Sequence, residues 1–295
     1  MEYITSCFVC NSVYINDLKG FESVYLCKCN TCGLIFDKRI PTERELYEHY
    51  KIYAYTSLKP LSLQTRKSYH HLLDEFEIYR RYGNILDIGC GQGDFLVEAQ
   101  KRGWNVYGTE FSQSAVSLCE SRGIMMYQGE LNDTIFKNIS FDVITSFEVI
   151  EHINTPHKLM LIVDTKLRKE GLFYCTTPNF NALLRFFEKS QFKMIGYPEH
   201  ISFYTKKSLV YLGNMYGFKV LKVLSTGIDI ERLLSVFPKK KQVSSNSKVI
   251  MKKSNENIRN LTGENYFFAM IKRFINWGLT FFNKGDTVKI YWIKK

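Results

Sequence analysis

The stretch "LDIGCGQGDF", residues 86–95, places three glycines within five positions directly after a short apolar run. Glycine permits a sharp turn and lets the backbone approach a ligand more closely than any residue with a Cβ atom. A dinucleotide-binding G-x-G-x-x-G pattern would need a small residue at position 94, where this chain has Asp94. The stretch therefore predicts a strand, a tight turn and a helix that face another kind of ligand. The candidate residues of this turn are Asp87, Gly89, Gly91 and Gly93.

Short apolar runs alternate with amphipathic segments on both sides of this turn. The runs expected to be strands are 84–90, 104–111, 124–129, 141–150, 172–179, 219–227 and 286–295. The segments expected to be helices are 42–82, 93–103, 112–123, 157–171, 206–218 and 265–284. On the first of these, the positions expected to face inward are Leu61, Leu63, Tyr69, Leu72, Leu73 and Phe76. This alternation is typical of an α/β fold, in which helices cover both faces of a mainly parallel sheet.

A second acidic residue supports a nucleoside ligand. Glu110 closes the second expected strand, 17 residues beyond Gly93, where a carboxylate can bind both hydroxyls of a ribose. A G-x-G-x-G turn preceded by an acid such as Asp87 is the pattern for S-adenosylmethionine. Together these residues favour a turn that binds a ligand over a turn that only connects a strand to a helix.

On these residues the chain resembles the class I S-adenosylmethionine-dependent methyltransferases over about residues 60–295. The resemblance implies a Rossmann-like, seven-stranded α/β sheet that ends in an antiparallel hairpin, with residues 286–295 as its last strand. It also implies that S-adenosylmethionine contacts the glycine turn, that Glu110 binds its ribose, and that Leu131 lies near its adenine. Phe147 and Glu148 would then lie close to the transferred methyl group.

Four cysteines near the N-terminus have the spacing of a zinc site. Cys7 and Cys10 are separated by two residues, 18 residues follow, and Cys29 and Cys32 again enclose two residues. Two such pairs form a tetrahedral site of four thiolates, which has no open position for catalysis. We therefore expect a structural Zn2+ in an N-terminal ribbon. Cys27 could replace one ligand, although its spacing fits less well.

The stretch "FEVIEH", residues 147–152, ends the fourth expected strand at the edge where open α/β sheets bind ligands. Three interpretations stay open. A second divalent metal on Glu148, Glu151, His152 and His200 could polarise an acceptor hydroxyl. Alternatively, His152 or His200 could take the proton of the acceptor directly. In the third interpretation, Glu151 and His152 only fix the loop, and Glu148 contacts the ligand.

The metal interpretation resembles two groups within the superfamily, namely enzymes that 2′-O-methylate the ends of small RNAs and some quinone-ring O-methyltransferases. The segments "TTPNFN", residues 176–181, and "YPEHISFYT", residues 197–205, instead resemble methyltransferases that act on glycans and small molecules in bacterial biosynthetic clusters. The zinc ribbon is also similar to that of sugar C-methyltransferases, which are longer chains with a further C-terminal domain.

The net charge of +11 is concentrated near the C-terminus. Residues 219–295 hold 16 Lys and Arg against 5 Asp and Glu, whereas residues 1–218 hold 24 of each. A basic, aromatic helix in this part could contact an anionic membrane surface or a phosphate-bearing substrate. Nucleic acid is disfavoured as a partner, because the expected cofactor domain is neutral overall and no RNA-binding module is visible.

The chain shows no targeting or spanning segment. Its N-terminus lacks a basic region followed by a long apolar stretch, and the uncharged run 274–282 is far shorter than the roughly 20 residues that cross a bilayer. We expect a cytoplasmic protein that at most touches the inner face of the membrane.

These observations predict five segments and a function. The segments are a zinc ribbon at 1–40, a helical lead-in at 41–82, the methyltransferase core at 83–237, a basic loop and helix at 238–284, and a final core strand at 285–295. The expected function is O-methylation of a sugar or glycan intermediate in surface polysaccharide or secondary metabolite synthesis. The acceptor would be a small molecule, a nucleotide sugar or a lipid-linked glycan. The alternatives are metal-dependent O-methylation of a quinone-type phenol or an RNA 2′-hydroxyl, and C-methylation of a sugar.

Overall fold

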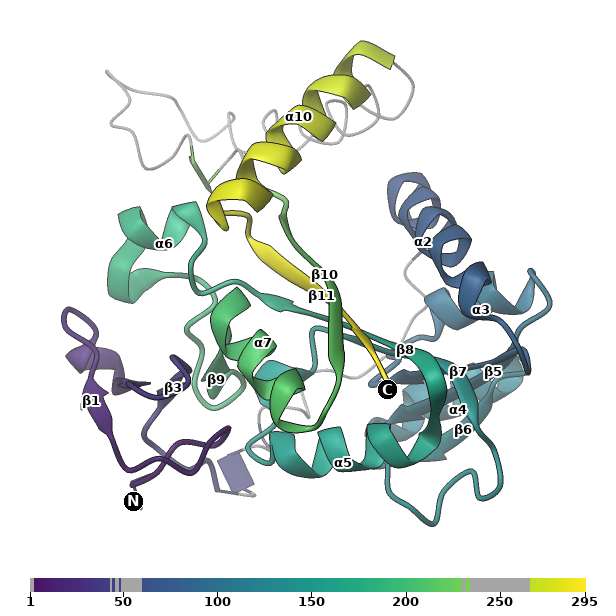
Figure 1. Ribbon diagram of the computed structural model, residues 1–295, viewed down its shortest axis with the longest axis horizontal. Helices are drawn as coiled ribbons and strands as arrows, with labels where there is room; N and C mark the ends of the chain where they lie inside the picture. The colour runs from purple at the N-terminus through teal and green to yellow at the C-terminus, as the bar shows by residue number, and fades with distance from the viewer. Residues whose placement is uncertain (1–2, 43, 46–47, 49–59, 230–231, 234–265) are drawn as a thin grey trace.

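A seven-stranded mixed sheet forms the centre of the molecule (Figure 1). The computed structural model describes the chain except for residues 1–2, 43, 46–47, 49–59, 230–231 and 234–265. In spatial order the strands are β10 (Lys219–Thr226), β11 (Thr287–Ile293), β8 (Leu167–Pro178), β7 (Phe141–Phe147), β4 (Asn84–Ile88), β5 (Asn105–Glu110) and β6 (Met125–Gln128). The last five of these are parallel, and β11 lies antiparallel between β8 and β10. The predicted fold class is confirmed.

Helices cover both faces of the sheet, as the alternating pattern predicted. The helices are α2 (Leu63–Phe76), α3 (Asp94–Gln100), α4 (Gln113–Ser121), α5 (Pro156–Lys166), α6 (Leu183–Glu188), α7 (Lys206–Met215) and α10 (Tyr266–Phe282). One buried cluster joins α2 and α3 to the sheet, and another joins α5 and α7 to its opposite face. Short 3-10 turns complete the set: η1 (Glu22–Val24), η2 (Glu77–Tyr79), η3 (Ile150–His152) and η4 (Lys189–Gln191).

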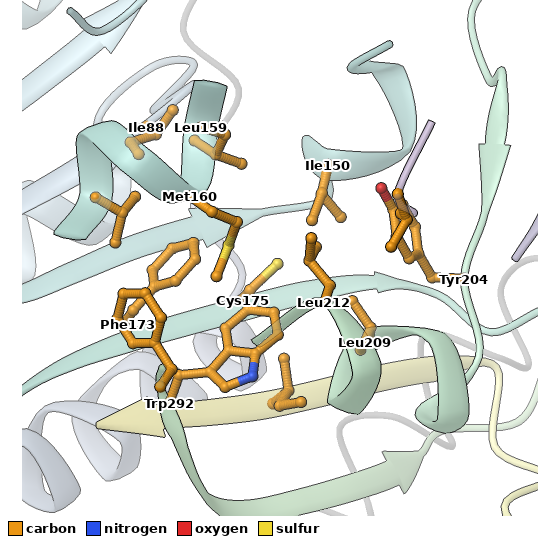
Figure 2. Close-up of a cluster of buried hydrophobic side chains, with 14 of the residues drawn as sticks. Ile88, Ile150, Leu159, Met160, Phe173, Cys175, Tyr204, Leu209, Leu212 and Trp292 are labelled. Carbon is orange, nitrogen blue, oxygen red and sulfur yellow. The ribbon is translucent and has the colours of Figure 1, made fainter. Parts of the chain in front are cut away.

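The core below α5 and α7 is filled by large side chains (Figure 2). Trp292 of β11 stacks on Phe173 of β8 at a centroid distance of 5.2 Å, and both are fully buried. A Cβ atom on Gly213 of α7 would lie 2.1 Å from the Trp292 indole nitrogen, so only glycine permits this approach of helix to strand. Ile150 points into the same cluster, and this anchors the turn that follows β7.

The N-terminal residues form a second, smaller sheet. Its antiparallel strands are, in order, β1 (Ile15–Asp17), β2 (Leu26–Cys29), β3 (Ile35–Asp37) and β9 (Ser202–Phe203). Because β9 comes from the segment between β8 and α7, the ribbon and the core share one sheet. The boundaries of the predicted segments stay predictions, and residues 238–265 of the basic segment lie outside the described residues.

The sequence interpretation was wrong in three places. The strand expected at 141–150 ends at Phe147, and Ile150 begins the 3-10 turn η3, because its side chain packs into the core. The helix expected at 157–171 ends at Lys166, because Leu167 is buried and pairs with Phe141 at the start of β8. Leu63, expected to face inward, is 57% exposed at the first position of α2. Residues 49–59 of the helical stretch expected at 42–82 lie outside the described residues. Within the described part of the chain, no helix has the length and apolarity needed to cross a bilayer.

Candidate functional site

The glycine turn after β4 is shaped by positive backbone angles and close contacts. Gly89, Gly91 and Gly93 have φ values of 69°, 55° and 73°, which strain any residue with a side chain. A Cβ atom on Gly89 would lie 2.6 Å from a methyl group of Val149, and one on Gly93 would lie 2.6 Å from Ile124. The turn therefore packs closely against Val149 and Ile124 at the carboxyl edge of the sheet, where only glycine fits, and Gly89 and Gly91 stay partly exposed.

Asp87 lies in the last part of β4 and is buried. Its carboxyl accepts a hydrogen bond of 2.8 Å from the Thr145 hydroxyl on the neighbouring β7. Burial raises the pKa of Asp87 to about 7, and the charge of Glu110 acts in the same direction. A cationic group of a ligand placed near this carboxyl would favour its ionised form.

Glu110 is held by backbone groups at the end of β5. One carboxylate oxygen accepts from the Gly91 amide at 3.0 Å, and the other accepts from the amides of Phe111 and Ser112 at 2.8 and 3.1 Å. The carboxylate thus bridges the glycine turn and the start of α4. The oxygen that accepts from Gly91 keeps a further lone pair with which it could bind a ribose hydroxyl, whereas the other oxygen already accepts two hydrogen bonds.

The other two residues predicted to lie near the cofactor, Leu131 and Phe147, pack against protein side chains. Leu131 is buried in the core, only 5% exposed. Phe147 packs within an aromatic group, with ring centroids 5.0 Å from Phe95 and 5.5 Å from Tyr174. Phe111 was not singled out from the sequence, yet its side chain is 72% exposed directly after Glu110 and could cover a planar base. Its position after a strand-ending acid was the available signal.

The "FEVIEH" segment leaves β7 through a strained turn. Glu148 has a φ of 53°, and its amide donates to the Thr176 carbonyl of β8 at 3.0 Å. Its side chain reaches solvent, yet the surrounding protein raises the pKa of its carboxyl. Because the Ile150 side chain is buried in the core, Glu148 lies on one side of this turn and Glu151 and His152 lie on the other.

His152 and His200 lie edge to face, with ring centroids 4.8 Å apart. The Nδ1 atom of His152 lies 2.9 Å from the Glu199 carbonyl, and that of His200 lies 2.8 Å from the Met194 carbonyl. A carbonyl only accepts, so both Nδ1 atoms carry the proton and both Nε2 atoms are left as bases or metal ligands. Burial and the neighbouring His200 lower the pKa of His152, which keeps its ring neutral.

Glu151 completes a cluster with these two histidines, their ligand atoms lying within 4.8 Å of one another. One carboxyl oxygen of Glu151 accepts from Thr177 at 3.0 Å, whereas the other is buried without a hydrogen bond among the described residues and lies 3.9 Å from His152 Nε2. Burial raises the pKa of Glu151 well above its usual value, and Glu148 adds to this effect. The cluster can therefore act in two ways, as a neutral histidine base or as a set of three ligands for a divalent cation. Glu148 is not part of it.

The four predicted zinc ligands converge in the ribbon. The sulfur atoms of Cys7, Cys10, Cys29 and Cys32 lie within 4.8 Å of one another, and the pairs Cys7–Cys32 and Cys10–Cys29 are each 3.4 Å apart. Four sulfurs at such distances fit a tetrahedral Zn2+. Cys27 points elsewhere, since its thiol donates to the Phe36 carbonyl and burial raises its pKa to about 12. The alternative ligand is thereby disfavoured.

Comparison with known proteins agrees with this geometry. The ubiquinone biosynthesis O-methyltransferase of Coxiella burnetii is 25% identical over 201 residues, which cover 64% of this chain and 84% of that protein. The protein of the same name from Aeromonas salmonicida is 26% identical, with 55% and 73% covered. The crystal structure of a SAM-dependent methyltransferase from Archaeoglobus fulgidus gives a TM-score of 0.50 at 17% identity, over 78% of this chain and 94% of that one.

The phosphoethanolamine N-methyltransferase 2 of Haemonchus contortus gives a TM-score of 0.52 at 15% identity, over 88% of this chain and 61% of that one. These structural similarities establish the fold. A family model described as a methyltransferase domain matches residues 61–223, more than half of the sequence. The chain therefore belongs to the S-adenosylmethionine-dependent methyltransferases.

Proposed function

We propose that this protein transfers a methyl group to a hydroxyl of a small acceptor, with the pair His152 and His200 as the base. S-adenosylmethionine supplies an electrophilic methyl group when it is bound. The glycine turn and Glu110 hold this cofactor at the carboxyl edge of the sheet. The observation that carries the proposal is that a carbonyl lies within hydrogen-bond distance of Nδ1 in both histidines, which favours the tautomer whose Nε2 can accept a proton.

The experiment compares His152→Ala and His200→Ala with the unchanged protein and with His71→Ala. His71 is a suitable control, because its side chain is 76% exposed on α2. If one histidine is the base, its variant should lose methyl transfer by roughly 100-fold or more and retain S-adenosylmethionine affinity in calorimetry. Full turnover in both variants would refute the proposed base.

The pH dependence gives a second readout. Because the pKa of His152 is lowered, activity that depends on its neutral form should persist below the pH at which an ordinary histidine becomes protonated. The rate should fall only on further acidification. A rate that falls with a midpoint above 6.5 would instead point to another group.

A metal-assisted form of the same reaction is the second candidate, favoured by the unpartnered buried oxygen of Glu151. Glu151, His152 and His200 would hold the ion, which could lower the pKa of an acceptor hydroxyl. Elemental analysis of the purified protein and of Glu151→Gln separates the two forms. Equal zinc in both and no further metal would support the histidine base, whereas a second metal present only in the unchanged protein would support the ligand set.

We propose a sugar or glycan intermediate as the acceptor, on the resemblance of residues 176–181 and 197–205 to glycan methyltransferases. The relatives named ubiquinone biosynthesis O-methyltransferase favour oxygen as the methylated atom and make a quinone-type phenol the alternative. An RNA 2′-hydroxyl and a sugar carbon are further alternatives. Methyl transfer measured in parallel to nucleotide sugars, catechols and RNA, followed by mass determination of the product, would distinguish these acceptors.

A further inference from the structure

Among the described residues, no hydrogen-bond acceptor is found for Arg185 of α6. Its guanidinium lies over the rings of Phe186, Phe180 and Phe21, at 4.1, 4.8 and 5.9 Å from their centroids. Its Nε atom is buried and has no hydrogen-bond partner among the described residues. Since guanidinium stays charged in proteins, a desolvated one without an acceptor is costly and calls for an explanation.

Lys284 brings a second positive charge to the same place. Its ammonium lies 3.8 Å from the Phe186 ring centroid and 3.1 Å from the Asn181 side-chain oxygen. The Leu183 amide donates to the Lys284 carbonyl at 2.9 Å, which fixes α6 beside the end of α10 (Figure 1). Burial and the charge of Arg185 both lower the pKa of Lys284, which is the effect expected of two neighbouring cations.

The nearby carboxylates do not neutralise this pair. Glu188, one turn after Arg185 on α6, forms an ion pair with Arg232. Asp286 accepts a hydrogen bond from the Asp229 amide at 2.8 Å and is influenced by Arg232. Among the described residues no ion pair joins a carboxylate to Arg185 or Lys284. If packing against phenylalanines were the whole role of Arg185, an apolar side chain would serve better.

The pair lies at the edge of the sheet that carries the acceptor site. Thr177, near the end of β8, binds Glu151, and α6 begins six residues later. Lys284 stands shortly before β11, whose first residue pairs with Pro178 at the end of β8. A group bound between α6 and the end of α10 could therefore belong to the same molecule that presents its hydroxyl to the histidine pair.

We propose that Arg185 and Lys284 bind a phosphate or diphosphate group of the acceptor. This inference rests on the proposed function and extends it. An arginine offers a planar fork for two phosphate oxygens, and a lysine adds a point charge. Phe186 and Phe180 hold the guanidinium in place and exclude water around it, which strengthens its interaction with an anion.

Such a phosphate could come from a nucleotide sugar or from a lipid-linked glycan. The helix α10, which ends two residues before Lys284, carries exposed aromatic side chains. Phe274, Trp277, Phe281 and Phe282 are each at least 64% exposed. The first three stack in sequence at 5.8 and 6.0 Å, and Phe282 meets Phe281 edge to face at 5.0 Å. An apolar face joined to a phosphate site suits a lipid diphosphate, whose chain could lie along α10.

The test measures binding of inorganic pyrophosphate to the full chain by calorimetry. We expect Arg185→Leu, which retains apolar contact with the phenylalanines, and Lys284→Ala each to weaken binding by about 10-fold or more. Lys193→Ala is the control, because this substitution removes one positive charge from an exposed lysine close to α6 in the sequence. Thermal unfolding of each variant reports whether it is folded, and Arg185→Lys, which keeps the charge, should bind better than Arg185→Leu.

Unchanged pyrophosphate affinity in folded Arg185→Leu and Lys284→Ala would overturn the phosphate site. Its failure is distinguishable from failure of the proposed function, because His152→Ala and His200→Ala should retain pyrophosphate affinity whether or not they lose methyl transfer. Conversely, a lost phosphate site would leave the histidine base untouched.

Two further arms identify the source of the phosphate. Uridine diphosphate should displace pyrophosphate if the acceptor is a nucleotide sugar. If it is lipid-linked, the protein should sediment with phosphatidylglycerol vesicles but not with phosphatidylcholine vesicles, and Trp277→Ala should reduce this binding. Failure of both arms, together with no pyrophosphate binding, would refute the inference.

Discussion

Asp87 shows how one residue can serve the cofactor at a cost to the fold. Its folded pKa of about 7 exceeds the ordinary value of 3.8, so the folded protein holds this proton more tightly than the unfolded chain does. The resulting stability is fully present below about pH 4 and is lost as the pH rises through about 7. The difference between the two pKa values limits the free energy of unfolding lost at pH 8, relative to pH 4, to on the order of 4 kcal/mol.

Replacing Asp87 with Asn should therefore raise the free energy of unfolding at pH 8 and change it little at pH 4. The same change should weaken S-adenosylmethionine binding, because the negative charge facing the cationic methionine end is lost. Urea unfolding at both pH values and calorimetry would check the two effects. Equal stability of the two proteins at pH 8 would show that Asp87 is not desolvated as the structure indicates.

We expect Glu110 to bind the cofactor through its carboxylate, which also accepts hydrogen bonds from the glycine turn and from the start of α4. Glu110→Ala should weaken S-adenosylmethionine binding by roughly 1–3 kcal/mol, the cost of lost charged hydrogen bonds. Glu110→Gln, which retains acceptor capacity through one oxygen, should lose less. Calorimetry on both variants measures the difference, and unchanged affinity in Glu110→Ala would remove this residue from the cofactor site.

The geometry of the glycine turn could be predicted, because it depends on local backbone chemistry. Glycine spacing and a strand-ending acid are properties of a few consecutive positions. Thr145 and Thr177 could not be found in this way, because each acts on a carboxyl group from another segment. The same holds for Arg185, whose guanidinium lies over the ring of Phe21 from the ribbon and over that of Phe180, two residues after β8.

At the scale of elements, the contact of α7 with β11 sets how closely a helix can approach the sheet. Gly213→Ala should lower the free energy of unfolding by about 1–3 kcal/mol, because the added methyl group collides with the rigid indole of Trp292. Urea unfolding measures this loss. The control is Gly278→Ala on α10, where a Cβ atom meets nothing within 4 Å and a helix former should not destabilise. Similar stability of both variants would contradict the close packing.

Element boundaries were predicted well where a cap or glycine marks them. Ser112 accepts from the Ala115 amide at the start of α4, and the helix was expected to begin at this serine. The boundary at Lys166 carries no such signal, since the helix passes directly into β8 and the pairing with Phe141 decides where the strand begins. The short strand β9 was missed for a related reason. It has only two residues, Ser202 and Phe203, and its partner strand β3 lies more than 160 residues earlier in the sequence.

At the scale of the whole molecule, the four-cysteine ribbon and the methyltransferase core share a sheet and an aromatic contact. Ile35 of β3 pairs with Phe203 of β9, and the Phe21 ring lies 5.7 Å from that of Phe180. The segment that contains β9 also carries His200. Four-cysteine zinc sites contribute directly to folding free energy, so loss of the metal should be felt beyond the ribbon.

Cys7→Ser should therefore lose zinc, lower the unfolding temperature of the whole chain and reduce methyl transfer, although Cys7 is no part of the acceptor site. The reason is that β9 loses its partner strand and no longer restrains the segment that carries His200. Cys27→Ser is the matched control, because its thiol lies outside the four-sulfur cluster and should leave the zinc content unchanged. Metal analysis, thermal unfolding and turnover would be measured on both variants. If Cys7→Ser lost its zinc but kept full activity, the ribbon would be independent of the acceptor site despite the shared sheet.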